Sequence, residues 1–518
     1  MNKIRLIILA NNKDDIFQIN RIIQNLQFQN VSLTVLYTNN NYNNIKSSIL
    51  KLFTKIIFFI ESKFINNDKF IKKKQGVLID QYETTLDKFV SKKSFFPDMI
   101  IDLSYHKIKN NFLKKVKYGH WYFDYGVSNN FFIGFYECLF NKKIFTTFLI
   151  KNFISNNKKK TKLIDKYHLN NKTNFWLRNK QFILEKSAVL ISKGLNKIYY
   201  KLIFIDNNFI KQKKNYQIQI KHVILYFIKK YFFYILKKIN LFNKQKVSLW
   251  SLHFIKYNKN FFFNNKINFK NSTKINSPKN YEWADPFIIK NKNKNYIFFE
   301  NNDLSINRGK ISCGELKNDK LTNIKDILKF NYHMSYPFIW KFKKNFFLIP
   351  ETSEKKSIHI WKAKNFPYQW QYFKKVLKNE YCCDTTIIKD NFNNNWLLTN
   401  KSNDTTGDPN NELYIYKIIG NFKKLIPHKL NPVITDCRIA RNAGNLLNLN
   451  YIYRPSQVNN SSGYGIGLNI NKILKIDLNS YKETIVNKIF PKNVKNSDGL
   501  HHINNSSDYI VFDIRYIL

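Results

Sequence analysis

The sequence is poor in the residues that build metal sites and disulfide frameworks. It has five cysteines: Cys138, Cys313, Cys382, Cys383 and Cys437. They include no CxxC pair and no spacing typical of a zinc site. A disulfide between the adjacent Cys382 and Cys383 would be strained, so we expect reduced thiols, as in a cytosol. We predict neither a metal nor another cofactor.

Long apolar segments are also lacking. The run Ile4–Ala10 follows the first residues, but Arg5 interrupts it and Lys13, Asp14 and Asp15 come soon after. We therefore interpret it as a β-strand and not as a signal peptide. No uncharged stretch is long enough to span a bilayer. We expect a cytoplasmic protein, with peripheral contact to a membrane left open.

Arginine is scarce, although the formal net charge is +51. The excess comes from lysines, which are scattered along every segment. The chain is also rich in Asn, Ile, Phe and Tyr, whose codons, like those of Lys, consist largely of A and T. An AT-rich genome explains this composition better than a nucleic-acid partner does, since such partners favour arginine. We predict no nucleic-acid partner; the charge would still favour loose association with anionic membranes or glycans.

The first part of the chain, residues 1–205, has the pattern of a doubly wound α/β domain. Four short apolar runs resemble buried parallel strands: Ile4–Ala10, Val31–Thr38, Val77–Asp80 and Met99–Leu103. Ile16–Leu26 has apolar residues at helical spacing. The turn after the first strand has no glycine-rich phosphate loop, so a nucleotide fingerprint is absent.

Residues 206–275 are predicted to form a basic helical linker and a lead-in strand. The lysine pairs Lys229/Lys230 and Lys237/Lys238 recur about two turns apart within Gln212–Lys246, as in a basic amphipathic helix. We favour a helix packed on one of the domains. An interfacial membrane anchor is the alternative.

Residues 276–518 contain a fivefold repeat with a period of about fifty residues. Each repeat has a strand, a polar turn, an aromatic second strand and one or two further strands. The first strands begin at Asp285, Tyr336, Asp384, Asn442 and Asp498. This pattern predicts a five-bladed β-propeller and disfavours a solenoid, whose strands would be less hydrophobic.

The first strands of propeller blades line the axis, so their starting residues should converge on one site. We predict Asp285, Asp384 and Glu351 as catalytic residues. We predict that six further residues bind substrate: Glu300, Arg438, Arg441, Arg454, Tyr464 and His501. Carboxylates together with arginines and aromatic rings suit a sugar or a sugar phosphate. Adjacent His501 and His502 point to opposite faces of a strand, which argues against a metal pair.

Short motifs in the repeat carry a family resemblance. They are Trp283-Ala-Asp-Pro-Phe, Ser335-Tyr-Pro-Phe, Pro350-Glu-Thr-Ser, Asn431-Pro-Val, Tyr453-Arg-Pro and Gly463-Tyr-Gly. In this order they resemble the propeller region at the N-terminus of plant glucosamine inositolphosphorylceramide transferases. That region also occurs in bacterial proteins of glycan clusters and is related to family 43 glycoside hydrolases. The resemblance therefore implies a bacterial protein, whose membrane contact would be with the inner membrane.

The resemblance to family 43 implies roles for two aspartates. Asp285 matches the general base of blade one, and Asp384 matches the residue of blade three that tunes a pKa. The family's general acid, a Glu that opens blade four, is missing, because Arg441-Asn442-Ala443-Gly444 stands there. Glu351 is the nearest substitute, and simple glycoside hydrolysis is not expected.

The first part is similar to formyltransferase-like domains through Pro97–Ser104, Tyr118–Gly126 and Gly134–Leu139. Formyl transfer needs an Asn-x-His pair and a later Asp. Tyr122 and Asp124 stand at the Asn and His positions, and only Asp165 follows as a candidate for the later Asp. The resemblance therefore implies a degenerate domain.

These patterns favour a carbohydrate-active protein of surface polysaccharide or glycolipid biosynthesis, in which the propeller transfers or binds sugar. Its partners would be a sugar, a sugar nucleotide or a glycolipid. A non-catalytic binding module with both domains degenerate is the alternative. Sugar N-formylation by the first part is a second alternative.

Overall fold

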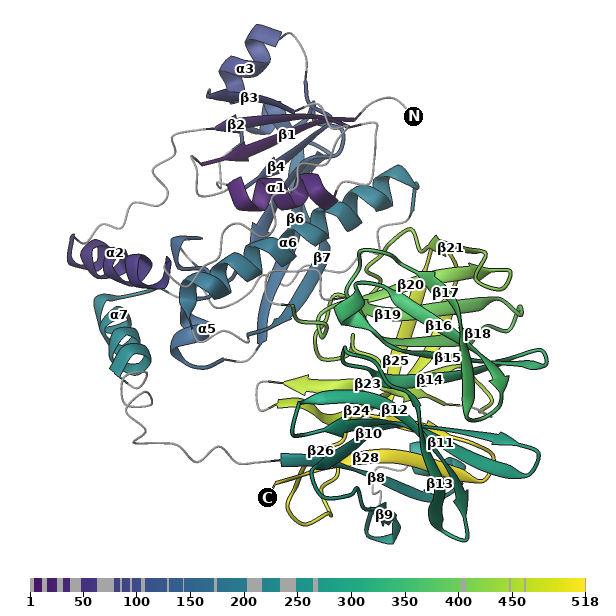
Figure 1. Cartoon of the computed structure of the whole chain (residues 1–518). Helices are drawn as coiled ribbons and strands as arrows, with labels where there is room; N and C mark the ends of the chain where they lie inside the picture. The colour runs from purple at the N-terminus through teal and green to yellow at the C-terminus, as the bar shows by residue number, and fades with distance from the viewer. Residues whose placement is uncertain are drawn as a thin grey trace. The chain divides into compact units, whose positions relative to one another are not determined.

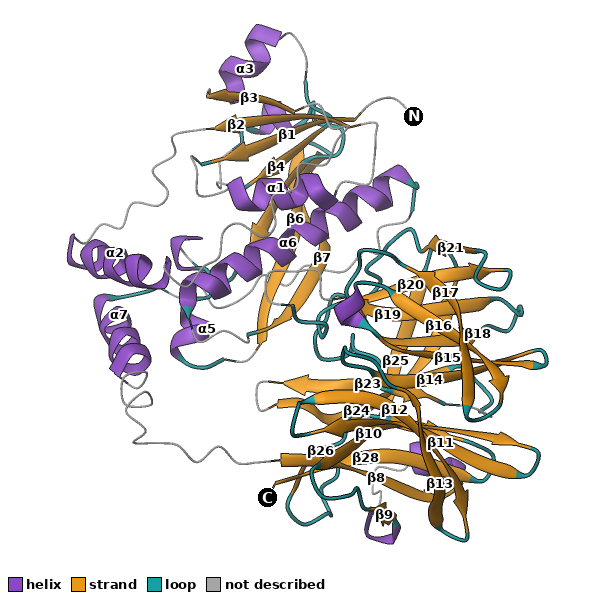
Figure 2. Ribbon diagram, in the orientation of Figure 1, coloured by secondary structure: helices purple, strands orange, loops and turns teal. Residues whose placement is uncertain are grey.

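The computed structural model describes most of the chain. The described residues are 4–11, 16–25, 31–37, 48–62, 79–83, 86–93, 96–103, 108–127, 130–142, 144–171, 175–202, 217–232, 248–263, 269–401, 407–446, 449–460 and 463–517. They form two compact units, Met1–Asn243 and Lys244–Leu518, shown in Figures 1 and 2. Within these ranges no helix combines the length and the apolar character needed to cross a membrane.

The first unit contains a seven-stranded sheet of order β3-β2-β1-β4-β5-β6-β7. Its strands are β1 (Ile4–Ala10), β2 (Val31–Tyr37), β3 (Ile79–Glu83), β4 (Met99–Asp102), β5 (His120–Asp124), β6 (Ile144–Ser155) and β7 (Lys158–Asn170). The strands from β3 to β5 pair in parallel. β6 and β7 form an antiparallel edge. The order of the parallel part is that of doubly wound sheets.

Both faces of this sheet are covered, as its apolar strands require. Leu6 and Ile8 of β1 pack in one core with α1 (Ile16–Asn25) and α6 (Trp176–Tyr199). Ile7 and Leu9 point to the other face, where α3 (Leu86–Lys93) and α4 (Asn110–Leu113) contribute. The described strands and helix lie where the sequence predicted them, with ends that differ by at most three residues, whereas residues 77–78 of the third predicted strand lie outside the described residues. The formyltransferase resemblance stays a prediction, because a sheet order alone does not identify a family.

The helix predicted within Gln212–Lys246 is described in part. It comprises α7 (Ile220–Phe227) and the π-helical turn η4 (Ile228–Phe232), and residues 233–246 lie outside the described residues. α7 packs beside α2 (Ser48–Ser62) and α5 (Phe135–Leu139) of the first unit. The described part is therefore a packed helix, the interpretation that we preferred.

The described residues of the second unit form five sheets, and the predicted five-bladed propeller is confirmed. Blade one comprises β10 (Tyr281–Asn291), β11 (Lys294–Asp303), β12 (Arg308–Lys317) and β13 (Lys320–Leu328). Blade two comprises β14 (Ser335–Phe342), β15 (Asn345–Glu351), β16 (Ile358–Asn365) and β17 (Gln369–Val376). Blade three comprises β18 (Cys382–Lys389), β19 (Asn395–Lys401), β20 (Leu413–Ile419) and β21 (Lys424–Pro427). All twelve strands follow their order along the chain.

Blades four and five are less regular. Blade four is built from β23 (Tyr453–Asn460), β24 (Gly463–Ile476) and β25 (Tyr481–Ile489). Its innermost segment, β22 (Gly444–Asn445), pairs in parallel with β27 of blade five. Blade five contains β26 (Ser497–Gly499), β27 (Ile503–Asn505), β28 (Tyr509–Ile517), β8 (Ser248–Lys256) and β9 (Thr273–Ile275). The two blades are thus joined through their innermost strands.

The strand β8 corrects the predicted domain boundary. We predicted a basic helical linker and a lead-in strand over 206–275 and a propeller from 276. The strand β8 lies in that range, but it belongs to the propeller, because it pairs with β28 along its whole length, from Ser248↔Ile517 to Lys256↔Tyr509. β9 extends the same sheet. Strands from both ends of the second unit therefore close the ring, and sequence missed this because β8 precedes the first repeat.

The inner strands share a backbone irregularity. The ladder register shifts between Ala284 and Phe287 in blade one, and the residue after Ala284 has a left-handed φ of 52°. Tyr336 and Asp384, at the same place in blades two and three, have a φ of 45°. Such a conformation is strained for residues other than glycine, so neighbouring groups must hold it.

Side chains from neighbouring blades hold the first two bulges and the start of blade four. The backbone N–H of Asp285 donates to Oδ2 of Asp513 in blade five, at 3.1 Å. The N–H of Tyr336 donates to Oδ2 of Asp285 at 3.2 Å, and the N–H of Asn442 donates to Oδ1 of Asn400 at 2.9 Å. Adjacent blades are therefore joined at the axis by hydrogen bonds as well as by apolar packing.

Replacing Asp513 with Asn tests this link. The fully buried carboxylate accepts three backbone N–H groups and pairs with His501. The neutral amide of Asn would remove the negative charge that faces the buried imidazolium. We expect the free energy of unfolding of the propeller to fall by about 3 kcal/mol. Six of the eight tryptophans lie in this unit, so their fluorescence during urea unfolding reports on it.

The matched control is Asp498→Asn in the same blade. Asp498 is exposed and pairs with Arg515, so its loss should change stability by less than about 0.5 kcal/mol. Equal stabilities of the two variants would contradict the proposed link.

Candidate functional site

Four of the five predicted strand starts meet at the axis. Asp285, Tyr336, Asp384 and Asn442 occupy equivalent positions of blades one to four. The Asn442 amide donates to the carbonyl of Asp384 at 2.8 Å. The Tyr336 hydroxyl accepts the N–H of Gly444 at 2.7 Å, which joins blade two to blade four across the ring.

The fifth strand start was wrong. Asp498 is an exposed residue of β26 whose carboxylate accepts a hydrogen bond from Arg515 at 2.6 Å. The residue of blade five that lies at the axis is His501, two residues before β27. His502 points away from the carboxylates and packs its ring on Phe287, with centroids 4.4 Å apart. The alternation expected for adjacent histidines is thus present.

His501 lies between two buried carboxylates. Its Nε2 is 3.3 Å from Asp285, and its Nδ1 is 2.8 Å from Asp513. The indole of Trp250, from β8, covers the imidazole with ring centroids 3.8 Å apart. Burial opposes the charged imidazole, but the two carboxylates outweigh burial and raise the pKa of His501 to about 9.

The carboxylates respond to the same environment in opposite directions. Burial raises the pKa of Asp285 well above its usual range, and the charges of Glu300 and Asp513 raise it further. Burial also acts on Asp513, but the charge of His501 outweighs it and lowers the pKa of Asp513. At neutral pH we therefore place an ionised Asp513 against a protonated His501.

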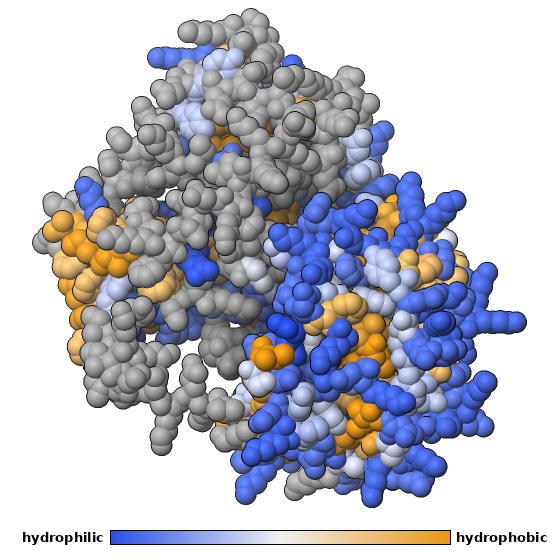
Figure 3. Space-filling view, viewed as in Figure 1, coloured by the Kyte–Doolittle hydropathy of each residue, from blue (hydrophilic) through white to orange (hydrophobic). Residues whose placement is uncertain are grey.

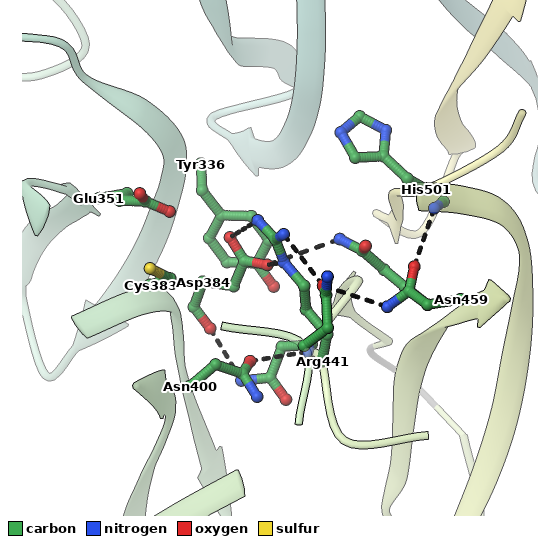
Figure 4. Close-up of polar contacts among 12 residues, drawn as sticks. Tyr336, Glu351, Cys383, Asp384, Asn400, Arg441, Asn459 and His501 are labelled. Atoms are coloured by element: carbon green, nitrogen blue, oxygen red, sulfur yellow. Dashed lines mark hydrogen bonds and ion pairs between the residues drawn. The ribbon is translucent and has the colours of Figure 1, made fainter. Parts of the chain in front are cut away.

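Asp384 has a guanidinium as its partner. Nε of Arg441 lies 2.6 Å from Oδ2 of Asp384, and the carboxylate is buried while the guanidinium is partly buried (Figure 4). The guanidinium also donates to Asn410 at 3.2 Å and stacks over the ring of Tyr464, with 4.5 Å between guanidinium carbon and ring centroid. Two predicted binding residues, Arg441 and Tyr464, thus meet a predicted catalytic one.

Glu351, at the end of β15, is only partly buried, and Figure 4 shows its carboxyl directed toward Asp384 and Tyr336. It accepts a hydrogen bond from the hydroxyl of Ser353 at 2.8 Å. Burial, followed by the charge of Asp384, raises the pKa of Glu351 to about 7. Near neutral pH this group can therefore give or take a proton.

Glu300 occupies in blade one the position of Glu351 in blade two. Each pairs in register with the residue before the bulge, Ala284 or Ser335. Nε2 of His333 lies 3.3 Å from the Glu300 carboxylate. Although burial acts against it, the hydrogen bond and charge of Glu300 raise the pKa of His333.

The site therefore combines several chemical functions. It has an acid poised near neutral pH, a neutralised carboxylate–guanidinium pair, and the partly exposed rings of Tyr464 and Trp250. Such rings suit the apolar faces of a sugar, and the polar groups suit its hydroxyls. Asp285, His501 and Asp513 also place ligand atoms within 4.8 Å of one another, close enough for one metal ion.

Residues 261–508 match the family model for the N-terminal region of glucosamine inositolphosphorylceramide transferase 1. The resemblance predicted from the motifs is confirmed for these residues. A rice relative of that name (Oryza sativa subsp. japonica) is 29% identical over 210 residues, which are 39% of this chain and 28% of the relative. The Arabidopsis thaliana protein is 27% identical over 208 residues, with 39% and 27% covered. The matched region thus spans little more than a quarter of these plant relatives.

Among solved structures, a GH62 α-L-arabinofuranosidase from Coprinopsis cinerea has a TM-score of 0.33 and 9% identity, covering 45% of this chain and 90% of its own. A GH43 β-1,3-galactosidase has a TM-score of 0.32 and 9% identity, covering 43% and 81%. Since both scores are low, the number of blades rests on the sheet topology described above.

Two of the predicted binding arginines do not fit a binding role. All five N–H groups of Arg454 are used inside the protein: by Glu483, by the carbonyls of Ile439 and Ala440, and by Asn442. Its side chain is 1% exposed, so it supports blade four and has no donor left for a ligand. Arg438 is exposed and makes a bidentate pair with Asp436. Sequence could not separate these two from Arg441.

Three functional residues were missed: Trp250, His333 and Asp513. Asp513 had a signal, because it is the one acid within the apolar strand Tyr509–Ile517. Trp250 and His333 had none, since one lies before the first repeat and the other lies in a loop.

Two acids that the formyltransferase resemblance singled out in the first unit make local bonds. The Asp165 carboxylate pairs with Lys193 at 3.1 Å and Lys197 at 3.5 Å on α6, and Asp124 accepts the N–H of Gly126 at 2.8 Å. Sequence missed the buried pair of His120 and Asp102, which is 3.1 Å long. The bonds of Asp165 and Asp124 stabilise local structure and leave the formyltransferase resemblance untested.

A histidine-selective NMR titration tests the cluster around His501. We expect one resonance with a pKa near 9, assigned because it disappears in His501→Asn. Since this pKa lies above the unfolded value of about 6.5, the stabilisation is complete below pH 6.5 and is lost as the pH rises through 9. His502, whose buried ring has a pKa lowered to about 3, should stay neutral throughout and serves as the internal control. A pKa of His501 near 6.5 would refute this arrangement.

Proposed function

We propose that the propeller transfers a sugar unit in the biosynthesis of a glycolipid or a surface polysaccharide. The observation that carries this proposal is the position of Glu351, a partly accessible carboxyl with a pKa near 7 beside the Asp384–Arg441 pair. A group with that pKa suits general acid–base chemistry at neutral pH. The names of the plant relatives support a glycolipid as acceptor.

In this proposal Glu351 acts as the general base. Its ionised carboxylate takes the proton of an acceptor hydroxyl, whose oxygen forms a bond to the anomeric carbon of a sugar nucleotide. The bond from that carbon to the phosphate oxygen breaks, and the phosphate leaves with the electron pair. Arg441 and Tyr464 orient the sugar, while Asp384 holds Arg441 in place.

A second candidate is a binding module without catalysis. Arg441 favours it, because this residue stands where the resemblance to family 43 hydrolases calls for a general acid, and Asp384 already neutralises it. Sugar N-formylation by the first unit is a third candidate that rests on the resemblance alone. The bacterial source and the cytoplasmic location also rest on sequence alone, and both relatives reported above are plant proteins.

Replacing Glu351 with Gln tests the leading proposal. The chain is incubated with a panel of sugar nucleotides and with inositolphosphorylceramide or a polyprenyl phosphate as acceptor, and the products are followed by mass spectrometry. We expect Glu351→Gln to lower the turnover of the productive pair by about 10²–10⁴-fold while donor affinity is retained. The wild-type rate should rise with pH through about 7, because the base must be ionised.

Glu354→Gln is the matched control, since Glu354 is an exposed acid three residues away and should not affect turnover. Unchanged turnover in Glu351→Gln would exclude Glu351 as the base. Donor binding by calorimetry without product from any pair would favour the binding module.

A further inference from the structure

Two neighbouring helices of the first unit expose apolar side chains. On α2 the residues Leu52, Ile56 and Phe59 follow helical spacing and are 59%, 39% and 63% exposed. On α7 and the turn that follows it, Ile224 and Ile228 are 40% and 50% exposed. Figure 3 shows apolar side chains gathered over α2, at the left of the view. We call these five residues the α2–α7 face.

The opposite sides of both helices are buried in one cluster. Ile57 of α2 and Val223 and Tyr226 of α7 pack there with Trp176 of α6. The exposed residues lie on the other side of each helix, so the α2–α7 face points away from this shared core. The helices pack against each other, so the two stripes lie on neighbouring elements.

A buried carboxylate fixes both helices to α6. Glu61, near the end of α2, accepts the N–H of Leu177 in the first turn of α6 at 2.6 Å. It also accepts the hydroxyls of Tyr226 and Tyr231, at 2.6 and 3.2 Å. This arrangement makes the α2–α7 face a fixed platform, so its apolar side chains cannot turn inward without breaking a buried network.

Lysines flank the α2–α7 face, and no exposed carboxylate lies on either helix. Lys55, Lys221 and Lys229 are exposed, whereas Glu61, the one acid of these two segments, is buried. Lysine stems can lie along apolar surface while their charges reach anionic head groups. A second copy of the chain would bring the same lysines together, and each copy carries a net charge of +51. Repulsion therefore disfavours a dimer through this face.

We propose that the α2–α7 face docks on an anionic lipid bilayer, with its apolar side chains in the interface and its lysines among the head groups. Apolar residues on one face of a helix with flanking lysines are the features of interfacial helices. Lysines near an anionic surface strengthen such docking. This proposal does not depend on the reaction of the propeller, although it would hold the chain next to a glycolipid acceptor.

Vesicle flotation with the full chain tests this proposal. The vesicles contain phosphatidylcholine alone or phosphatidylcholine with about a third phosphatidylserine. We expect the wild type to float with the anionic vesicles and to float far less with the neutral ones. The variants Leu52→Glu and Ile228→Glu should each weaken partitioning about tenfold, because a charge replaces an inserted side chain.

Ile306→Glu is the matched control. Ile306 is 58% exposed in a turn of the propeller, so it resembles Leu52 in size and exposure but lies outside the α2–α7 face. Its partitioning should equal that of the wild type, and Lys55→Glu should weaken binding to the anionic vesicles alone. Circular dichroism and the melting temperature verify that each variant is folded.

Three outcomes would overturn the proposal. The first is that the wild-type chain floats with neither kind of vesicle. The second is that Leu52→Glu and Ile306→Glu partition equally, which would mean that scattered lysines cause the binding. The third is a dimer in sedimentation that Leu52→Glu dissociates without any vesicle binding, which would make a second copy the occupant.

Discussion

The structure of the propeller depends on the hydrogen bonds that join its blades at the axis. A left-handed residue at each of the first three inner strands turns the chain out of its ladder, and neighbouring blades supply acceptors to the backbone N–H of the first two, Asp285 and Tyr336. Asp513 is central because it receives the N–H of Asp285 and thereby connects the last blade to the first. The pairing of β8 with β28 closes the same junction from outside. Ring closure thus requires a carboxylate in a buried place.

That requirement determines the charges of the site. Buried carboxylates need cations, and the chain places His501 between Asp285 and Asp513, and Arg441 against Asp384. Among the described contacts, Glu351 has a hydroxyl as its direct partner and no ion pair. Because no paired cation offsets its burial, the pKa of Glu351 is raised. Glu351 can therefore exchange a proton near neutral pH, whereas Asp285, whose pKa is also raised, lies against His501.

The sequence repeat made most of the inner-strand positions at the axis predictable. A period of about fifty residues places Asp285, Tyr336, Asp384 and Asn442 at one position of successive blades, whatever their chemistry. The inner position of blade five was predicted wrongly. It holds His501, whereas Asp498, which lies nearby, fits the pattern of an aspartate at the start of the strand. The burial of Arg454 could not be foreseen either, since its partner Glu483 lies on another strand. Repeats reveal equivalent positions, but partners across strands appear only in three dimensions.

The pairing pattern also bears on the choice between breaking and forming glycosidic bonds. Inverting hydrolysis needs one free acid and one free base on opposite sides of the sugar. Here Asp384 is neutralised by Arg441, and Asp285 shares His501 with Asp513, so neither is an unpaired base for water. One proton-exchanging group, Glu351, is enough for transfer to a hydroxyl, because the phosphate of a sugar nucleotide leaves without protonation by the protein. The distribution of charge therefore supports transfer or binding over hydrolysis.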